Sequence, residues 1–222
     1  MKRLADDASL EKGHTKLDNI PNQVERLGDD RSWLITAFLP FTPTIEEMKE
    51  LWAMKPGERT EIMIMGKKVK VPRFDQSFGQ AYRFSGSLHP AKPIPPLIGR
   101  FLFFANDCCA TLLKRDYRAR VFNAVFLNWY DDGEHYIGWH SDDETQLFKN
   151  ERGETLVFSI SLGQERLFKI RSKSSKETKE VKLANKSCLL MGGLCQTNYK
   201  HCVPKQKRVT RGRINLTFRI FK

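Results

Sequence analysis

The order of apolar and polar positions divides the chain into an N-terminal part that predicts helices and a C-terminal part that predicts short strands. Residues 1–30 are polar, mixed in charge and without hydrophobic periodicity, which predicts a flexible extension. Ordered structure is expected from near Trp33, where SWLITAFLPF predicts a strand. In TPTIEEMKELWAM the apolar residues share one helical face, and Thr44 followed by Glu47 predicts a capping box. The prolines of PIPPLIGRFLFF precede apolar positions that suit a second helix.

Beyond about residue 119 the pattern changes to short runs rich in β-branched and aromatic residues. The runs are RVFNAVFLNWY, ETLVFSISLG, RLFKIR, SCLLM and RINLTFRIF, separated by turn material such as DDGE and RSKSSKETK. Many short strands joined by such turns are typical of a β-sandwich or barrel. We therefore expect one domain over residues 31–222, mainly β within an α+β class. Its helical part is expected at 31–118 and its β core at 119–222.

The composition narrows the classes of partner and compartment. Lys and Arg outnumber Asp and Glu by 38 to 26, and the net charge of +12 favours a polyanionic partner. Nucleic acid is the first candidate and an anionic membrane surface the second, although charge can also serve solubility alone. Five cysteines without a C-x-x-C pair argue against a disulfide framework and a zinc ribbon, and favour a reducing compartment. We expect an intracellular protein, because there is neither a signal-peptide pattern nor a run of about 20 apolar residues.

The stretch GWHSDDE carries the first candidate chemistry. If it is extended, His140 and Asp142 lie on one face, because residues two apart in a strand point the same way. They can then take two adjacent positions on one metal, and His201 in YKHCVP is the best third ligand among the remaining histidines. Two histidines and a carboxylate with open positions form the facial triad of non-haem Fe(II) oxygenases. Taken alone, H-x-D also occurs in ordinary polar turns.

A second candidate is RGRINLTFR, which as a strand puts Arg213, Asn215, Thr217 and Arg219 on one face and apolar residues on the other. The polar row has two interpretations: a solvated outer face, or a site where guanidinium groups bind a dicarboxylate. Asn128 and Tyr130 in LNWY share a face in the same way and could add an amide and a phenol.

Together these motifs resemble the AlkB family of Fe(II)/2-oxoglutarate-dependent dioxygenases, in particular its eukaryotic-type DNA/RNA alkylation-repair members. The motifs N-x-Y, W-H-S-D-D-E, H-x-V-P and R-x-N-L-T-F-R appear in family order, and VPR at 71–73 and YRFSG at 82–86 also match. The resemblance runs from about Ile62 to Phe221. It implies a double-stranded β-helix, a jelly-roll relative, with the N-terminal helices packed outside.

The resemblance also implies roles for individual residues. The expected Fe(II) ligands are His140, Asp142 and His201, and the expected 2-oxoglutarate contacts are Asn128, Tyr130, Arg213, Asn215 and Arg219. The expected substrate contacts are Tyr82, Phe84, Ser85, Asp143, Glu144 and Met65. In a relative that repairs duplex DNA an aromatic wedge stands where this chain has Met65. We expect phosphate contacts from two basic stretches, namely Lys67, Lys68, Lys70 and Arg73, and Lys205, Lys207, Arg208 and Arg211.

The implied activity is oxidative demethylation of bases such as 1-methyladenine and 3-methylcytosine in DNA or RNA, with release of formaldehyde and succinate. It would use Fe(II), 2-oxoglutarate and dioxygen, with ascorbate as a possible reductant. We expect a monomer that does not bind membranes, in the nucleus or cytoplasm. Three alternatives remain: the same chemistry on a protein side chain or a regulatory RNA mark, a non-catalytic basic nucleic-acid-binding module, and a zinc hydrolase. The zinc hydrolase ranks last, because it leaves the arginine row unexplained.

Overall fold

The computed structural model describes residues 22–84, 87–113 and 122–222, and its framework is formed by two largely antiparallel sheets that face each other. The eight-stranded sheet contains, in spatial order, β1 (Gln23–Arg26), β2 (Ser32–Phe38), β14 (Ser187–Gly193), β11 (Val157–Gly163), β16 (Arg213–Arg219), β9 (Ala124–Tyr130), β5 (Phe74–Phe78) and β8 (Ala91–Lys92). The four-stranded sheet contains β10 (Ile137–His140), β15 (Tyr199–Val203), β12 (Arg166–Ser172) and β13 (Thr178–Leu183). This is the jelly-roll arrangement that the motif resemblance implies.

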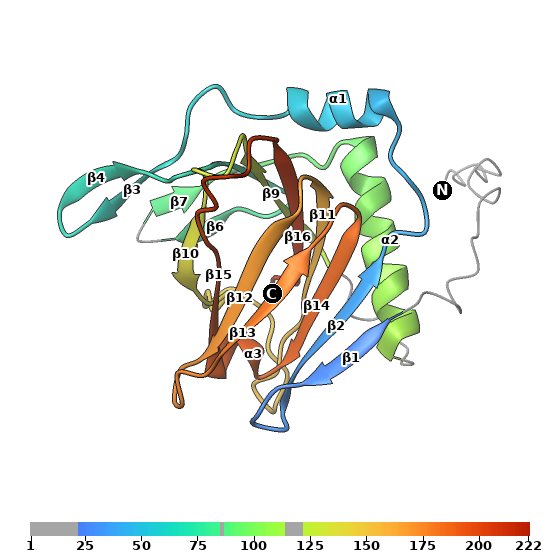
Figure 1. The fold of residues 1–222 in the computed structure, drawn as a ribbon, viewed down its shortest axis with the longest axis vertical. Coiled ribbons are helices and arrows are strands. Elements are labelled where there is room, and N and C mark those ends of the chain that lie inside the picture. Colours follow the sequence, from blue (N-terminus) through green and yellow to red (C-terminus); the bar gives the residue numbers. More distant parts are fainter. Residues whose placement is uncertain (1–21, 85–86, 114–121) are drawn as a thin grey trace, which may run out of the picture.

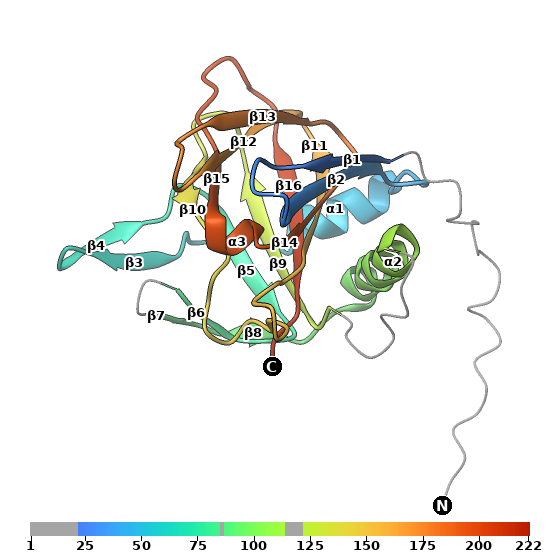
Figure 2. The ribbon, with the colours of Figure 1, turned by 90° about the horizontal axis from the view of Figure 1, so that it is seen from below.

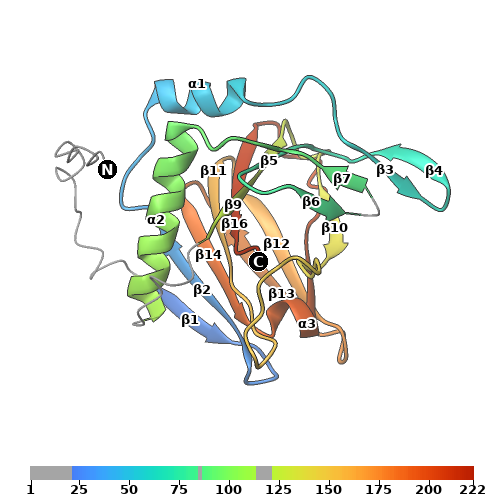
Figure 3. The same ribbon diagram turned by 180° about the vertical axis from the view of Figure 1, so that it is seen from behind.

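Among the described residues, two hairpins and three helices surround the sheets. The hairpin β3–β4 (Glu61–Ile64 and Lys67–Lys70) projects away from the body of the molecule in all three views, and β6–β7 (Tyr82–Phe84 and Ser87–His89) lies near its base (Figures 1, 2 and 3). Helix α2 (Pro96–Leu113) runs along the outer face of the large sheet, and α1 (Ile45–Ala53) crosses the ends of its strands. The short α3 (Cys195–Asn198) directly precedes β15. Both longer helices therefore lie outside the space between the sheets.

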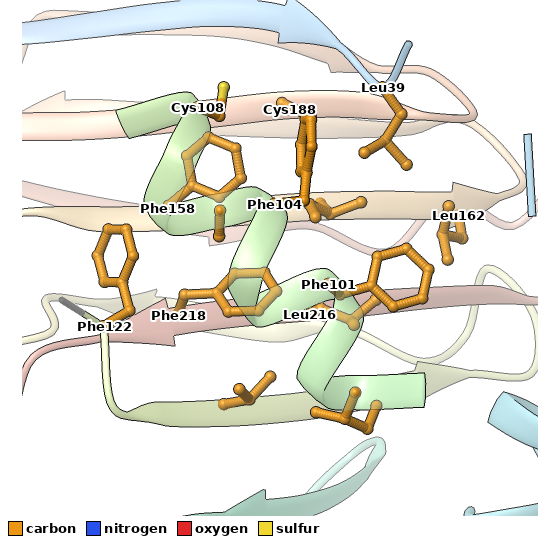
Figure 4. Close-up of a cluster of buried hydrophobic side chains, with 14 of the residues drawn as sticks. Leu39, Phe101, Phe104, Cys108, Phe122, Phe158, Leu162, Cys188, Leu216 and Phe218 are labelled. Atoms are coloured by element: carbon orange, nitrogen blue, oxygen red, sulfur yellow. The ribbon is translucent and has the colours of Figure 1, made fainter. Parts of the chain in front are cut away.

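The main hydrophobic core fills the space between α2 and the large sheet. Figure 4 shows Phe101, Phe104 and Cys108 of α2 against Phe158 of β11 and Phe218 of β16. Burial of such aromatic side chains contributes roughly 2–3 kcal/mol each. By length and composition alone α2 could cross a membrane. Its residues Ile98, Phe101, Ala105 and Cys108 are fully buried against the sheet, which is the environment of a core helix.

The start of α1 follows the predicted capping box. The Thr44 side chain accepts a hydrogen bond from the Glu47 backbone N–H at 3.1 Å, and the Glu47 carboxylate accepts one from the Thr44 N–H at 2.8 Å. The helix also meets the end of β9, where the indole N–H of Trp129 donates to the Leu51 carbonyl at 2.9 Å. Helix α1 thus closes one end of the large sheet.

The structure differs from the predicted division of the chain in two respects. Strand β1 begins at Gln23, inside the range expected to be a flexible extension, and Leu27 is buried; residues 1–21 lie outside the described residues. The part predicted to be mainly helical also supplies β5 and β8 to the large sheet, besides β2, which SWLITAFLPF predicted. The prediction missed β1 because it is an edge strand with mostly exposed polar residues and so carries little hydrophobic pattern.

Candidate metal and dicarboxylate site

The inner face of β16 forms the floor of a polar cavity between the two sheets. Arg213, Asn215, Thr217 and Arg219 all point into this cavity and are between 1% and 9% exposed. Ile214, Leu216 and Phe218 point to the α2 core instead. The polar row is therefore buried, and the alternative of a solvated outer face is wrong.

Strand register extends the polar row across the sheet. Asn215 pairs with Asn128 of β9 on one side and with Ser161 of β11 on the other, and Asn128 pairs with Asp75 of β5. Residues paired across a sheet share a face, so the four side chains lie on the same side of it. Asp75, Asn128 and Asn215 line the cavity, and Ser161 accepts a hydrogen bond from Arg213. The neighbouring pair is Arg213 and Tyr130. The structure thus brings together the five residues predicted to hold 2-oxoglutarate.

The opposite wall carries the candidate metal ligands. His140 of β10 pairs with His201 of β15, and Asp142 is the second residue after the end of β10. Their ligand atoms all lie within 4.8 Å of one another. The His140 Nδ1 contacts the Gly138 carbonyl at 2.9 Å, and since a carbonyl can only accept, Nδ1 carries the proton and Nε2 is free for a metal. One imidazole from each paired strand and one carboxylate match the ligand set of a facial triad.

The charges in the site favour metal binding at neutral pH. Burial lowers the pKa of His201 to about 3, with His140 adding to the effect, so the imidazole is neutral. Burial also lowers the pKa of His140, and Asp142 only partly opposes this shift. For Asp142 burial alone would raise the pKa, but the positive charge of Arg219 foremost outweighs it and keeps the carboxyl ionised. Two neutral imidazoles and one carboxylate are the protonation states that a metal requires.

The far end of β16 has the donors that a carboxylate ligand needs. Arg213 is 1% exposed, and its Nη2 donates to Ser161 Oγ at 2.9 Å and to Asn215 Oδ1 at 2.7 Å. Within the described part of the chain, its Nε and Nη1 have no hydrogen-bond partner although they are buried. Unsatisfied buried donors on a guanidinium are costly, and a bidentate carboxylate would satisfy them. The pocket therefore fits one carboxylate of 2-oxoglutarate at Arg213.

At the metal end, Arg219 contacts two carboxylates. Its Nη2 donates to Asp142 Oδ1 and its Nη1 to Glu144 Oε1, the latter at 2.9 Å. Burial raises the pKa of Glu144, while Arg219 opposes that shift. Glu144 is thus an inner side chain next to the metal ligands, and the geometry links the metal end of the cavity to Arg219.

The prediction that Arg73 contacts phosphate is wrong, because its side chain is 8% exposed and lines the cavity. Its Nε donates to Asn128 Oδ1 at 2.6 Å. Arg73 directly precedes β5, and the pairing of β5 with β9 carries it to Asn128. It belongs to the wall of the site, beside the residues expected to hold 2-oxoglutarate.

The other predicted substrate contacts are only partly described. Tyr82 and Phe84 lie in β6, but their side chains are outside the described part, as is all of Ser85. Asp143 is exposed next to the metal ligand Asp142. Met65 is 98% exposed at the tip of the β3–β4 hairpin, where Met65 and Gly66 both have positive φ. Asp143 and Met65 are therefore accessible to a large ligand.

The remaining predicted phosphate contacts are on exposed surface. In the β3–β4 hairpin, Lys67, Lys68 and Lys70 are exposed, and Lys70 pairs with Glu58 at 2.8 Å. The loop after β15 carries the exposed Lys205, Lys207, Arg208 and Arg211, of which Lys205 lies 3.2 Å from Glu134. The structure leaves all of them accessible to a polyanion.

Three functional neighbours escaped the sequence analysis. Ser161 belongs to none of the motifs, but its hydroxyl accepts a hydrogen bond from Arg213. Gln196 of α3 is 1% exposed, and its Oε1 accepts a hydrogen bond from the Asp142 backbone N–H at 2.8 Å. Asp75 lines the cavity from β5. Strand alternation in ETLVFSISLG could have indicated Ser161; the other two depend on tertiary packing.

Comparisons with known proteins agree with this geometry. A family model of the 2OG-Fe(II) oxygenase superfamily matches residues 33–219. The DNA oxidative demethylase ALKBH2 of Mus musculus is 33% identical over 174 residues, covering 73% of this chain and 67% of that protein. The proteins of that name from Bos taurus and Homo sapiens are each 32% identical over 73% of this chain, which spans 58% and 62% of their lengths. The solved structure of OsALKBH1 matches with a TM-score of 0.59 at 18% identity, over 90% of this chain and 99% of that one.

Proposed function

This chain belongs to the 2OG-Fe(II) oxygenase superfamily and, within it, to the AlkB family, and on that premise we propose that it demethylates N-alkylated bases in nucleic acid. It is an Fe(II)/2-oxoglutarate-dependent dioxygenase. The observation that carries the proposal is the cavity between the sheets, where the cluster of His140, Asp142 and His201 faces a buried arginine row. The proposed substrates are bases of the 1-methyladenine and 3-methylcytosine type, in DNA or RNA.

In this proposal His140, Asp142 and His201 hold Fe(II), and β16 holds 2-oxoglutarate. When bound, the two cofactors supply with dioxygen the oxidising power that hydroxylates an N-methyl group, which then leaves as formaldehyde. The protein's part is to fix the geometry. Arg213 binds the carboxylate remote from the metal, and Asn128 and Tyr130 line the same side of the cavity. Hydrogen bonding within the Arg213–Asn215–Thr217 row keeps these donors in place.

The proposed choice of substrate is supported by charge around the cavity. 1-Methyladenine and 3-methylcytosine are cationic, and the exposed Asp143 beside the metal ligand can pair with that charge. Exposed lysines on the β3–β4 hairpin and on the loop after β15 can contact phosphates without reading sequence. Met65 at the hairpin tip can act as an apolar wedge beside a flipped base. An intracellular location fits these substrates and the five buried free thiols.

The test is turnover with methylated oligonucleotides in the presence of Fe(II), 2-oxoglutarate and air, read as formaldehyde and as base reversal. Asp143→Asn is expected to lower base reversal much more than the uncoupled consumption of 2-oxoglutarate, because it leaves the ligands in place. The matched control is Asp107→Asn, which changes an exposed acidic residue of α2 that does not line the cavity. If 2-oxoglutarate is consumed but no methylated DNA or RNA base is reversed, the substrate proposal is wrong and a protein or other substrate must be sought.

A further inference from the structure

Arg166, at the start of β12, is a buried cation that the mechanism above does not use. It is 1% exposed, and its guanidinium makes four hydrogen bonds. The acceptors are the carbonyls of Asp132, His135 and Pro204 at 3.0, 2.8 and 2.8 Å, and the Gln206 side-chain oxygen at 3.2 Å. All four are neutral oxygens. Burial lowers the pKa of Arg166, and Tyr130 and the Asp132 carboxylate, which makes no hydrogen bond to it among those named, only partly oppose this shift.

These acceptors fix the position of Arg166 with respect to two loops. Gln206 also accepts from the Leu167 N–H at 2.8 Å, and its backbone N–H donates to Gly133 at 2.9 Å. A Cβ at Gly133 would lie 1.9 Å from the Gln206 carbonyl, so the two loops are in direct backbone contact. Arg166 therefore cannot swing away from its position without breaking its own hydrogen bonds to both loops.

The same guanidinium lies against the ring of Tyr130, which is 2% exposed. The Arg166 Cζ is 5.5 Å from the ring centroid, and the Arg213 Cζ is 5.1 Å from it. Burial, with Arg166 nearby adding to it, lowers the pKa of Arg213 to about 10, so both groups remain cationic at neutral pH. One phenol ring is thus in contact with two buried positive charges.

The position of Arg213 along β16 shows at which end of the cavity the charges of Arg166 and Arg213 lie. Arg219 contacts the metal ligand Asp142, whereas Arg213 stands at the other end of the seven-residue strand. An extended strand of this length separates its ends by about 20 Å. The pair of cations around Tyr130 therefore lies at the end remote from the metal, where a dicarboxylate would place its distal carboxylate.

We infer that Arg166 is a positioning residue for 2-oxoglutarate: from outside the cavity it holds Tyr130 against Arg213, and it adds a second positive charge beside the Tyr130 ring, at the end of the cavity that receives the distal carboxylate. The inference rests on the assignment of the Arg213 pocket to 2-oxoglutarate. At roughly 10 Å and an effective dielectric constant of about 20, removing one charge weakens binding about tenfold. The effect falls on the distal carboxylate alone, and a ligand without that group does not experience it.

The experiment compares two ligands by calorimetry without air, with Mn(II) in place of Fe(II). The ligands are 2-oxoglutarate and 2-oxopentanoate, which has the same chain but no distal carboxylate. Wild type, Arg166→Met and Arg166→Lys are measured, and Arg171→Met is the matched control. Arg171 lies on the same strand, but its guanidinium packs on Trp139 at 4.2 Å instead.

We expect Arg166→Met to weaken 2-oxoglutarate about tenfold while 2-oxopentanoate changes by less than about twofold. Arg166→Lys, which keeps the charge, should retain most of the affinity, and Arg171→Met should match wild type. Equal losses for both ligands would show a merely structural role and overturn the inference, as would no loss. If wild type itself does not prefer 2-oxoglutarate, the pocket assignment fails first. Should Arg166→Met not fold, Arg166→Gln offers donors to the loop carbonyls without the charge and must show the same selective loss.

Discussion

A hydrogen bond from Asp142 to Gln196 supports the metal site, and a single substitution can remove it. The Asp142 N–H donates to Gln196 Oε1 at 2.8 Å, and the two residues are 2% and 1% exposed. The Gln196 Nε2 makes only a weak contact of 3.6 Å with the Met191 sulfur. Gln196→Met keeps the length of the side chain and removes the acceptor, so apart from the weak contact with Met191 it removes this one bond.

The cost follows from burial. Water cannot replace the lost acceptor, so the Asp142 N–H is left unsatisfied, which costs about 1–3 kcal/mol. In a domain of this size that lowers the midpoint of thermal unfolding by about 2–4 °C for each kcal/mol. Because Asp142 is also freed to move, we expect affinity for Fe(II) to fall by about 10–100-fold, the usual effect of removing a group that orients a metal ligand.

Two assays are used, both monitored by tryptophan fluorescence. Chemical denaturation in the presence of a chelator measures the stability of the metal-free protein, and Fe(II) titration of a separate, chelator-free sample without air measures the affinity. The control is Gln146→Met, the same substitution at an exposed position. Gln196→Met should be less stable than Gln146→Met and bind Fe(II) more weakly. Equal stability and equal affinity in the two variants would refute the reasoning, because Asp142 would then be held by other contacts.

Three further predictions concern the hairpin, the sheet and the N-terminal turn. Met65→Ala should lower activity on double-stranded more than on single-stranded oligonucleotides and leave the unfolding free energy unchanged, since the side chain is 98% exposed. Gly192→Ala should lower the midpoint of thermal unfolding, unlike Gly57→Ala, because its Cβ would lie 2.0 Å from the Trp33 ring while Gly57 has open space. Burial alone would raise the pKa of Asp29, but hydrogen bonds from Asn198 and Ser32 outweigh it and lower the pKa. The ionised Asp29 carboxylate therefore adds to the free energy of unfolding above about pH 4, and this contribution is lost as the pH falls. In denaturant titrations the difference in stability between wild type and Asp29→Asn should narrow below that pH.

Local patterns were enough to predict the elements with strong periodicity. The alternation in RINLTFR predicted both faces of β16, and Thr44 with Glu47 predicted the start of α1. The ligand spacing in GWHSD also predicted that His140 and Asp142 share a site, although Asp142 lies just beyond the end of β10. These predictions succeeded because each depends on residues close in sequence.

The errors arose where tertiary pairing decides. Arg73 stands in a basic stretch and therefore resembled surface charge, but the β5–β9 pairing buries it against Asn128. Strand β1 is polar because it is an edge strand, so it carries no hydrophobic alternation. Gln196 gains its role only because α3 is packed beside Asp142. None of these long-range contacts leaves a signal in the local sequence.

The most direct test of the central proposal is an anaerobic titration with Fe(II) and 2-oxoglutarate, followed by air and a methylated oligonucleotide. Formaldehyde and base reversal are read together in wild type, His140→Ala and Arg213→Ala. We predict reversal by wild type and its loss in both variants, with Fe(II) binding lost only in His140→Ala. Base reversal that persists in His140→Ala, or Fe(II) binding without any consumption of 2-oxoglutarate, would contradict the assignment of this cavity as the oxygenase site.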